Sequence, residues 1–213
     1  MMGQARAPKR EESARRQQRR ASILEVSAKL FATRGFVGTT VRDIADEAGL
    51  LSGSLYYYFD SKEDIADELL TRLLDVLWAR YEEVVQSSAA PRAKLEAIVR
   101  VSLEGIHEFP HEVALFQKEG PYLATLDRFQ YIADRNDQFQ KMLTAVLEVG
   151  VRQHEFRSDI HVDVVFRFIR DSMWPIVAWY RPGGPLSIDD VCSDYLTVLL
   201  GGIDVQVGDA QTA

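Results

Sequence analysis

Apolar residues recur at spacings of three and four along almost the whole chain after residue 15, and no segment shows the strict alternation of a half-buried strand. In the first of these segments, Ile23, Leu30 and Phe31 lie on one side of a helix. This helix should end at Gly35, because glycine readily takes the left-handed conformation that follows many helices. The pattern predicts an all-α fold of about nine helices.

A helix-turn-helix is predicted between residues 39 and 58. Thr39 and Thr40 offer capping hydroxyls to a helix over residues 41–48, and Gly49 should end it. Ser52 can cap a third, short helix that runs to Tyr58. Three residues join the two helices, which is a spacing typical of DNA-binding helix-turn-helix motifs.

The third predicted helix carries small and hydroxyl-bearing side chains at its N-terminal end. Leu55 and Phe59 are four residues apart and should face inward, which leaves the following residues largely on other faces: Ser52, Gly53, Ser54, Tyr56 and Tyr57. A recognition helix brings its first turn close to base edges and phosphates, so small side chains permit approach and hydroxyls can bond phosphate oxygens. A plain helical hairpin with a tyrosine-rich edge is the alternative.

Charge is distributed unevenly along the chain, whose net formal charge is -7. Residues 1–62 hold eleven Lys or Arg against seven Asp or Glu, whereas the remainder holds fourteen against twenty-five. Seven of the basic residues precede position 21, and residues 1–14 are predicted to be a disordered basic arm. The arm is either a solvated tail or a contact to the DNA backbone or minor groove.

The segments 40–45 (TVRDIA), 48–59 (AGLLSGSLYYYF) and 61–63 (SKE) resemble the DNA-binding domain of the TetR family of regulators. This resemblance implies a three-helix DNA-binding domain, a fourth helix linking it to the body, a homodimer, and repression relieved by a small ligand. It implies DNA contacts by Thr40, Arg42, Ser52, Gly53, Ser54, Tyr56, Tyr58 and Lys62, with Lys62 meeting a phosphate. Family members often carry His where Tyr58 stands, which leaves the role of Tyr58 open.

We expect residues 15–61 to form the helix-turn-helix domain, residues 62–203 a helical ligand-binding and dimerisation domain, and residues 204–213 a disordered tail. The body should contain helices over 62–86 and 91–107, a segment interrupted by Gly120-Pro121, and a long helix over 126–153. Two more helices should follow near 162–181 and 187–200, the last opened by a capping box of Ser187 and Asp190.

The predicted helix near 162–181 mixes large aromatic residues with arginines. Phe166, Arg170 and Trp174 recur every four residues, so one face would suit an apolar ligand with an anionic end. Pro175 should kink the helix there, and a kink can open a pocket. A dimer interface is the equal alternative, because tryptophan and arginine are enriched in interface hot spots.

This helix, with residues 131–136 (YIADRN) and 179–186 (WYRPGGPL), also resembles actinobacterial members of the TetR family that repress the late, ring-degrading part of cholesterol catabolism. That resemblance implies a coenzyme A thioester of a steroid-ring fragment as effector, with Arg170 and Trp174 important for the response. Because the body is acidic, the coenzyme would need local cations such as Arg167, Arg170 or Arg181.

An enzyme must be considered, because His107-Glu108-Phe109-Pro110-His111 matches the H-E-x-x-H pattern of zinc peptidases. Pro110 opposes a continuous helix across the motif, which zinc binding by both histidines requires. We therefore expect no catalytic residues, no metal site and no cofactor. A zinc hydrolase and a constitutive DNA-binding protein without an effector remain the alternatives.

Composition is that of an ordinary globular protein, with 46% hydrophobic and 27% charged residues. The longest apolar run, residues 173–180, is far shorter than the ~20 residues of a membrane-spanning helix. The N-terminus has no apolar segment behind its charges, and the single Cys192 cannot form an internal disulfide. We expect a cytoplasmic protein with no membrane partner.

Overall fold

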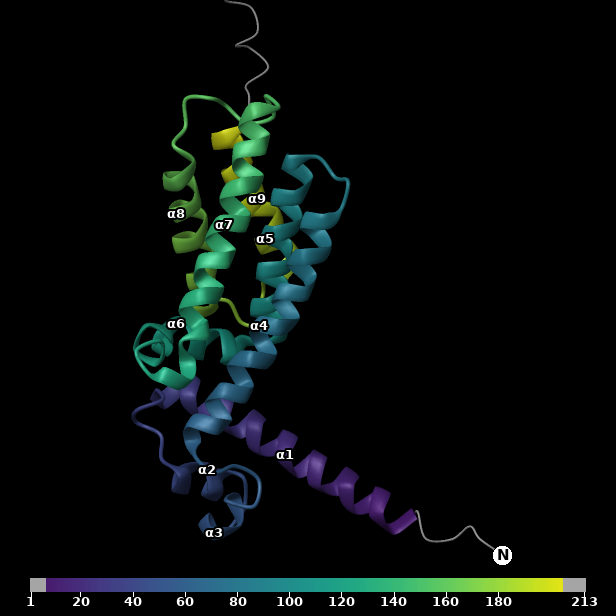
Figure 1. Ribbon diagram of the computed structural model, residues 1–213, viewed down its shortest axis with the longest axis vertical. Coiled ribbons are helices and arrows are strands. Elements are labelled where there is room, and N and C mark those ends of the chain that lie inside the picture. Colours follow the sequence, from purple (N-terminus) through teal and green to yellow (C-terminus); the bar gives the residue numbers. More distant parts are fainter. Residues whose placement is uncertain (1–6, 205–213) are drawn as a thin grey trace, which may run out of the picture. The chain divides into compact units, whose positions relative to one another are not determined.

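The computed structural model describes residues 7–204, and within them the chain forms nine α-helices and two short 3₁₀ helices with no named strand (Figure 1). The prediction of an all-α fold is confirmed. The chain divides into two compact units, residues 1–71 and 72–213, and each is described by itself. Helix α4, Lys62–Gln86, begins in the first unit and continues into the second.

The N-terminal unit is built from α1 (Ala7–Arg34), α2 (Val41–Glu47), α3 (Ser52–Leu55) and the first part of α4. Gly35 and Gly49 take positive φ angles of 82° and 64°, so the two predicted helix ends are confirmed. The buried side chains that form the core are Ile23, Leu24, Ala28, Leu30, Phe31, Phe36, Ile44, Ala45, Leu55, Phe59, Ile65, Ala66, Leu69 and Leu70.

Helix α1 begins earlier than the sequence predicted. Residues 7–14 were expected to be disordered, but they form the first two turns of α1. Their sequence, APKREESA, consists mostly of residues with high helix propensity, and the turns extend a helix whose later part is fixed by buried Ile23 and Phe31. Residues 1–6 of the predicted arm lie outside the described residues.

Helix α3 is shorter than predicted. It ends at Leu55, and residues 56–58 form a turn instead of a further helical turn. The N-cap is Leu51, which makes no side-chain capping bond, so Ser52 does not cap the helix as expected. Leu51 itself is exposed, whereas Leu55 and Phe59 are buried as predicted.

The C-terminal unit contains the rest of α4, α5 (Pro91–Glu108), α6 (Pro110–Leu123), α7 (Tyr131–Arg152), α8 (Val162–Met173) and α9 (Ile188–Ile203). The two 3₁₀ helices are η1 (Asp127–Phe129) and η2 (Trp174–Ala178). Helix α5 packs against both α7 and α9, and α8 packs against α7 (Figure 1). This arrangement encloses one apolar core that includes Leu103, Leu147 and Met173.

Three features of the C-terminal unit differ from the prediction. Gly120-Pro121 does not interrupt its segment, because Pro121 lies in the last turn of α6 and the helix runs on to Leu123. The predicted long helix begins at Tyr131 rather than residue 126, after the 3₁₀ turn η1. The predicted kink at Pro175 is a change of helix type, since α8 ends at Met173 and η2 follows.

The last helix agrees with the sequence at its start. Ser187 and Asp190 form the predicted capping box, in which each side chain bonds the other residue's backbone N–H. At the other end, Asp204 was assigned to a disordered tail, but it pairs with Phe156 in a β-bridge and with Arg92 in an ion pair of 3.1 Å. Residues 205–213 lie outside the described residues.

Candidate nucleic-acid interface and ligand pocket

The N-terminus of α2 is held by a capping box between Thr40 and Asp43. The Thr40 hydroxyl accepts a bond from the Asp43 N–H at 3.1 Å, and the Asp43 carboxylate accepts one from the Thr40 N–H at 2.8 Å. The Thr40 hydroxyl also donates to the Asp43 carboxylate, and this bond together with the one from the Thr40 N–H holds the pKa of Asp43 below its ordinary value. Thr40 is exposed, so its side chain caps the helix and is also accessible from outside.

Arg42 is the second residue of α2 and one of its most exposed side chains. Its side chain is 84% exposed, and within the described residues it pairs with Asp46, at 3.7 Å one turn along the helix. An exposed pair of this kind contributes little to stability, so it leaves the guanidinium available to another anion. Arg42 therefore stands at the start of α2 where a nucleic acid could reach it.

The outer face of α3 and its following turn is open. A Cβ built on Gly53 would meet nothing within 4 Å, and Tyr56 and Tyr57 are 55% and 78% exposed. Ser52, Ser54 and Tyr58 are half-buried. The predicted contact residues therefore occupy one exposed stretch, which also contains Tyr57, a residue left out of the predicted set although its sequence position marked it as outward-facing.

Lys62 has a different environment from the one expected. Its ammonium donates to the Phe36 carbonyl at 2.9 Å and the Thr39 carbonyl at 3.0 Å, and it lies 4.5 Å from the centre of the Phe36 ring. These carbonyls belong to the segment that leads into α2. Lys62 thus fixes this segment to the start of α4, and at most one of its three N–H groups is left for a phosphate.

Two arginines of α1 support the same surface and were not singled out from the sequence. Arg20 pairs with Glu68 of α4 and lies 4.3 Å from the centre of the Phe59 ring. Arg16 donates to the carbonyl of Tyr57 at 3.4 Å. The basic run at residues 15–20 is therefore partly used inside the unit, where it holds the turn after α3 in place.

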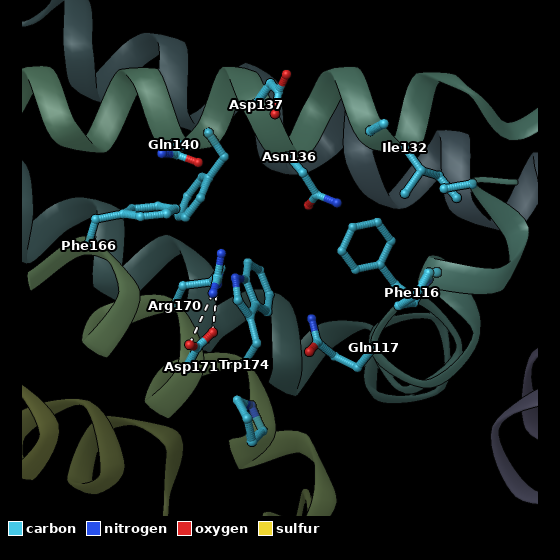
Figure 2. Close-up of a pocket in the computed structure, with 16 residues that line it drawn as sticks. Phe116, Gln117, Ile132, Asn136, Asp137, Gln140, Phe166, Arg170, Asp171 and Trp174 are labelled. Carbon is cyan, nitrogen blue, oxygen red and sulfur yellow. Dashed lines mark hydrogen bonds and ion pairs between the residues drawn. The ribbon is translucent and has the colours of Figure 1, made fainter. Parts of the chain in front are cut away.

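A cavity of about 610 Å³ lies in the C-terminal unit (Figure 2). Its walls come from α6, which supplies Phe116 and Gln117 from its middle, from α7, and from the junction of α8 and η2. Phe166, Arg170 and Trp174, the three residues predicted to form a ligand site, all lie on its wall. In Figure 2 the Arg170 guanidinium and the Trp174 ring extend toward α7, where Asn136 and Gln140 face them.

The aromatic part of the wall is a connected set. The Phe139 ring lies 6.4 Å from the Phe166 ring and 6.3 Å from the Trp174 ring, between centroids. Phe139 and Trp174 also line a second, small cavity of about 50 Å³ that extends toward Trp78 and Arg135. The Arg135 guanidinium lies 5.3 Å from the centre of the Trp78 ring and bonds Asp75 at 3.1 Å. An apolar ring system would find flat surfaces on several sides.

The charged residues on this wall are Arg170, Asp171 and Asp137, and the first two form a pair. Arg170 donates from Nε to Asp171 at 2.6 Å and from its terminal nitrogen to the other Asp171 oxygen at 3.0 Å (Figure 2). These bonds raise the pKa of Arg170 and lower the pKa of Asp171, so both groups are charged. Asp171 was not identified from the sequence, because neighbouring residues on a helix do not normally face each other.

The other two arginines considered as partners for a coenzyme do not line the cavity. Arg167 is exposed on the far side of α8 from Phe166, and it is absent from the wall. Arg181 donates to the carbonyls of Tyr180 at 2.7 Å and Ala178 at 3.0 Å, so it caps the end of η2. Of the three arginines, only Arg170 can contact a ligand in this cavity.

Helices α8 and α9 also carry an exposed apolar surface. A shallow groove of about 700 Å³ runs between them and is lined by Phe168, Trp179, Leu186 and Val198, all of them exposed. Large exposed apolar side chains gathered on one surface mark interaction sites. The sequence left open whether this segment forms a ligand pocket or a dimer interface, and different residues suit each role. Phe166, Arg170 and Trp174 line the cavity, whereas Phe168 and Trp179 line this groove.

The H-E-x-x-H match does not form a helical motif. Helix α5 ends at Glu108 and α6 begins at Pro110, so the two histidines lie on different helices. The His107 Nδ1 is 2.7 Å from the Tyr180 hydroxyl. Among the described residues there is no group of three His, Cys, Asp or Glu side chains that could hold a metal ion. Cys192 is buried, which raises the pKa of its thiol.

No helix in the described part of the chain is both long enough and apolar enough to cross a membrane.

Comparison with known proteins gives matches to both units. Residues 23–69 match the family described as "Bacterial regulatory proteins, tetR family", and residues 88–203 match the "Tetracyclin repressor-like, C-terminal domain". The chain is 50% identical to the HTH-type transcriptional repressor KstR2 of Mycobacterium tuberculosis over 185 residues, which are 87% of this chain and 92% of that protein. The repressor of the same name from Rhodococcus jostii is 48% identical over 87% of this chain and 91% of its own length.

Among solved structures, the ketosteroid transcriptional regulator KstR2 of Mycobacterium tuberculosis is similar to this chain with a TM-score of 0.86 at 49% identity. The match covers 88% of this chain and 96% of that one.

Proposed function

This chain belongs to the TetR family of bacterial transcriptional regulators, and on that premise we propose that it is a repressor that leaves its operator when a small molecule binds. It is not an enzyme, since the relatives that match it over most of their length are transcriptional repressors. A repressor of this kind works on chromosomal DNA, and we therefore place it in the cytoplasm.

The exposed stretch formed by the start of α2 and by α3 carries the DNA-binding part of the proposal. The predicted contacts are Thr40, Arg42, Ser52, Gly53, Ser54, Tyr56 and Tyr58, with Lys62 behind them. Gly53 offers no side chain at the point of closest approach, and the neighbouring hydroxyls can bond phosphate oxygens. Arg42 can either hold a phosphate or read a guanine.

A dimer is what the family requires, and the groove between α8 and α9 is the surface we propose for it. Two copies would cover Phe168, Trp179 and Val198, which are exposed in one chain. The operator should then be nearly palindromic, because two symmetry-related recognition helices enter successive major grooves. Half-site centres should lie about 34 Å apart or a multiple of that distance.

The effector we propose is a coenzyme A thioester of a steroid-ring fragment. The cavity is large enough for a drug-sized body and is lined largely by aromatic and apolar side chains, with Arg170 as the cation among them. The fused rings would lie against Trp174 and Phe166, and an anionic group would meet Arg170. The names of the close relatives, a ketosteroid regulator among them, support a ligand of this chemical class.

The decisive experiment measures operator affinity with and without a series of steroid-ring coenzyme A thioesters, after the operator has been found by sequencing the DNA that the protein retains. Ligand and DNA should oppose each other with a coupling of about 1 to 3 kcal/mol, or roughly 5- to 150-fold in affinity. Arg170→Ala and Trp174→Ala should bind DNA normally and respond weakly to the thioester. If both variants release DNA at the wild-type concentration, the ligand binds elsewhere.

Arg167→Ala is the matched control for this experiment. It removes the same side chain from the same helix, three residues from Arg170, but from outside the cavity wall. Its response to the thioester should equal that of the wild type. A protein that binds its operator and ignores every thioester would instead be a constitutive DNA-binding protein.

A further inference from the structure

The cavity contains its own anion. Among the described residues that line it, Arg170 is the one Lys or Arg, and the edge of its guanidinium that carries Nε and one terminal nitrogen is bonded to Asp171. A carboxylate bound in this way occupies a two-pronged position that a ligand carboxylate or phosphate could take. An anionic ligand can therefore use this edge of Arg170 only if Asp171 leaves.

Helix geometry does not impose this pair. Adjacent residues of an α-helix point about 100° apart, so Arg170 and Asp171 meet only because both side chains bend toward each other. The Asp171 side chain is 62% exposed, and its hydrogen bonds within the described part of the chain are those from Arg170. Arg167, four residues earlier on α8, also attracts the carboxylate electrostatically. Rotation of the carboxylate into water would free the guanidinium.

Arg170 lies beside an aromatic ring that belongs to the core. Its guanidinium lies 5.5 Å from the centre of the Phe166 ring, on a residue that is buried in the core. The Arg170 side chain is 41% exposed, so water also reaches it. In the empty cavity Asp171 supplies the anion beside this cation, and a ligand would supply it in the filled one.

We propose that Asp171 is a built-in competitor for the anion site of Arg170, which raises the concentration of an anionic ligand needed to fill the cavity. This inference rests on the proposed function, in which Arg170 receives the anionic end of the effector. Binding exchanges one ion pair for another, so the anion adds less affinity than an unpaired arginine would give. The exchange keeps the cavity from responding to weak anions that are abundant in a cell.

The test compares wild type, Asp171→Asn and Asp163→Asn by nuclear magnetic resonance, following the Arg170 Nε–H and Trp174 indole N–H signals. Asp163→Asn is the control, because Asp163 is an exposed acid on the same helix that does not line the cavity. The probes are inorganic phosphate, lithocholate as a fused-ring carboxylate, and the neutral primary amide of lithocholate. Thermal unfolding checks that each variant is folded.

Asp171→Asn should bind phosphate and lithocholate about two- to fivefold more tightly than wild type, the size expected for removing a half-exposed competing ion pair. The amide should bind all three proteins equally, and Asp163→Asn should match the wild type. Equal or weaker anion binding by Asp171→Asn would overturn the proposal, and weaker binding would make Asp171 a positioning residue for Arg170.

The phosphate measurement separates this proposal from the proposed function. If lithocholate binds neither protein, phosphate alone still decides whether Asp171 competes for Arg170, and no phosphate binding by Asp171→Asn overturns the competition. If phosphate binds as expected but no steroid-ring thioester releases DNA, the proposed effector is wrong, whereas the proposal that Asp171 competes for Arg170 still holds.

Discussion

Replacement of Lys62 by Met should weaken the N-terminal unit more than it weakens the electrostatic attraction to DNA. The substitution keeps an unbranched apolar stem but removes the ammonium that bonds the carbonyls of Phe36 and Thr39. Both carbonyls lie directly before the capped start of α2. Their loss of a partner should loosen the segment that places Thr40 and Arg42 on the surface.

The size of this effect follows from the contacts of Lys62. A hydrogen bond from a charged group contributes about 1.5 to 3 kcal/mol net when it is buried, and the half-buried position of Lys62 calls for the lower end of that range. Its contact with the Phe36 ring adds roughly 0.5 kcal/mol. Some of this sum is recovered when water reaches the two carbonyls. We expect the free energy of unfolding to fall by about 2 to 3 kcal/mol.

Two measurements test this reasoning, urea unfolding and the dependence of operator affinity on salt. If Lys62 acts mainly on structure, the Lys62→Met variant loses stability while the slope of log affinity against log salt stays the same. A phosphate contact would instead lower that slope by about 0.9. Unchanged stability together with the lower slope would refute our interpretation. Lys29→Met, an exposed lysine on α1, is the matched control.

Two further substitutions test the proposed DNA and dimer surfaces. Arg42→Ala should cost about 1 to 3 kcal/mol of operator affinity and relax the preference at one base position if Arg42 reads a guanine, or weaken binding to all sequences equally if it holds a phosphate. Binding to a randomised operator library distinguishes these outcomes. If neither affinity nor sequence preference changes, Arg42 is not part of the interface. Val198→Glu should raise the dimer dissociation constant at least about tenfold, because it would bury an unpaired charge in the interface. Thr197→Glu, next to the groove, should leave that constant unchanged. If sedimentation shows equally stable dimers for both variants, the interface lies elsewhere.

Local signals in the sequence predicted much of the fold. Gly35 and Gly49 end their helices at positive φ, and Ser187 with Asp190 opens α9 through the predicted capping box. Each of these features depends on residues within four positions of one another, so a single chain contains all the information needed. Helix α4 has its predicted bounds for the same reason, since Ser61 bonds the Asp64 N–H at 3.1 Å just before the helix starts.

The errors arose where distant contacts or helix type decide the outcome. Residues 7–14 look like a polar tail, but they continue a helix that is anchored by apolar residues two turns later. The part of α3 after Leu55 has no helical stop signal, and the turn there keeps Phe59 buried. The phosphate contact of Lys62 stays a prediction, but no pattern along the chain indicates that its ammonium also meets carbonyls more than twenty residues away.

The residues that line the cavity could also be predicted only in part from the sequence. A four-residue repeat predicted that Phe166, Arg170 and Trp174 share a face, and the structure places all three on one wall. The opposite walls come from α6 and α7, so Phe116 and Asn136 could not be placed against them by any spacing within α8. The pairing of Asp171 with Arg170 could not be predicted in this way, since the same spacing rule assigns neighbouring residues to different faces.

If a ligand controls DNA binding, only some of its contacts with the protein can change the affinity for the operator. A ligand weakens DNA binding only by the difference between its affinities for the two arrangements of the protein, so a tight but indifferent ligand would leave the operator occupied. Helix α4 runs from the unit that carries the predicted DNA contacts into the unit whose smaller cavity is lined by Leu73, Leu77 and Trp78. We therefore expect that ligand contacts reaching this cavity through Phe139 and Trp174 act on α4, and that the Arg170 pair affects how tightly anionic ligands bind.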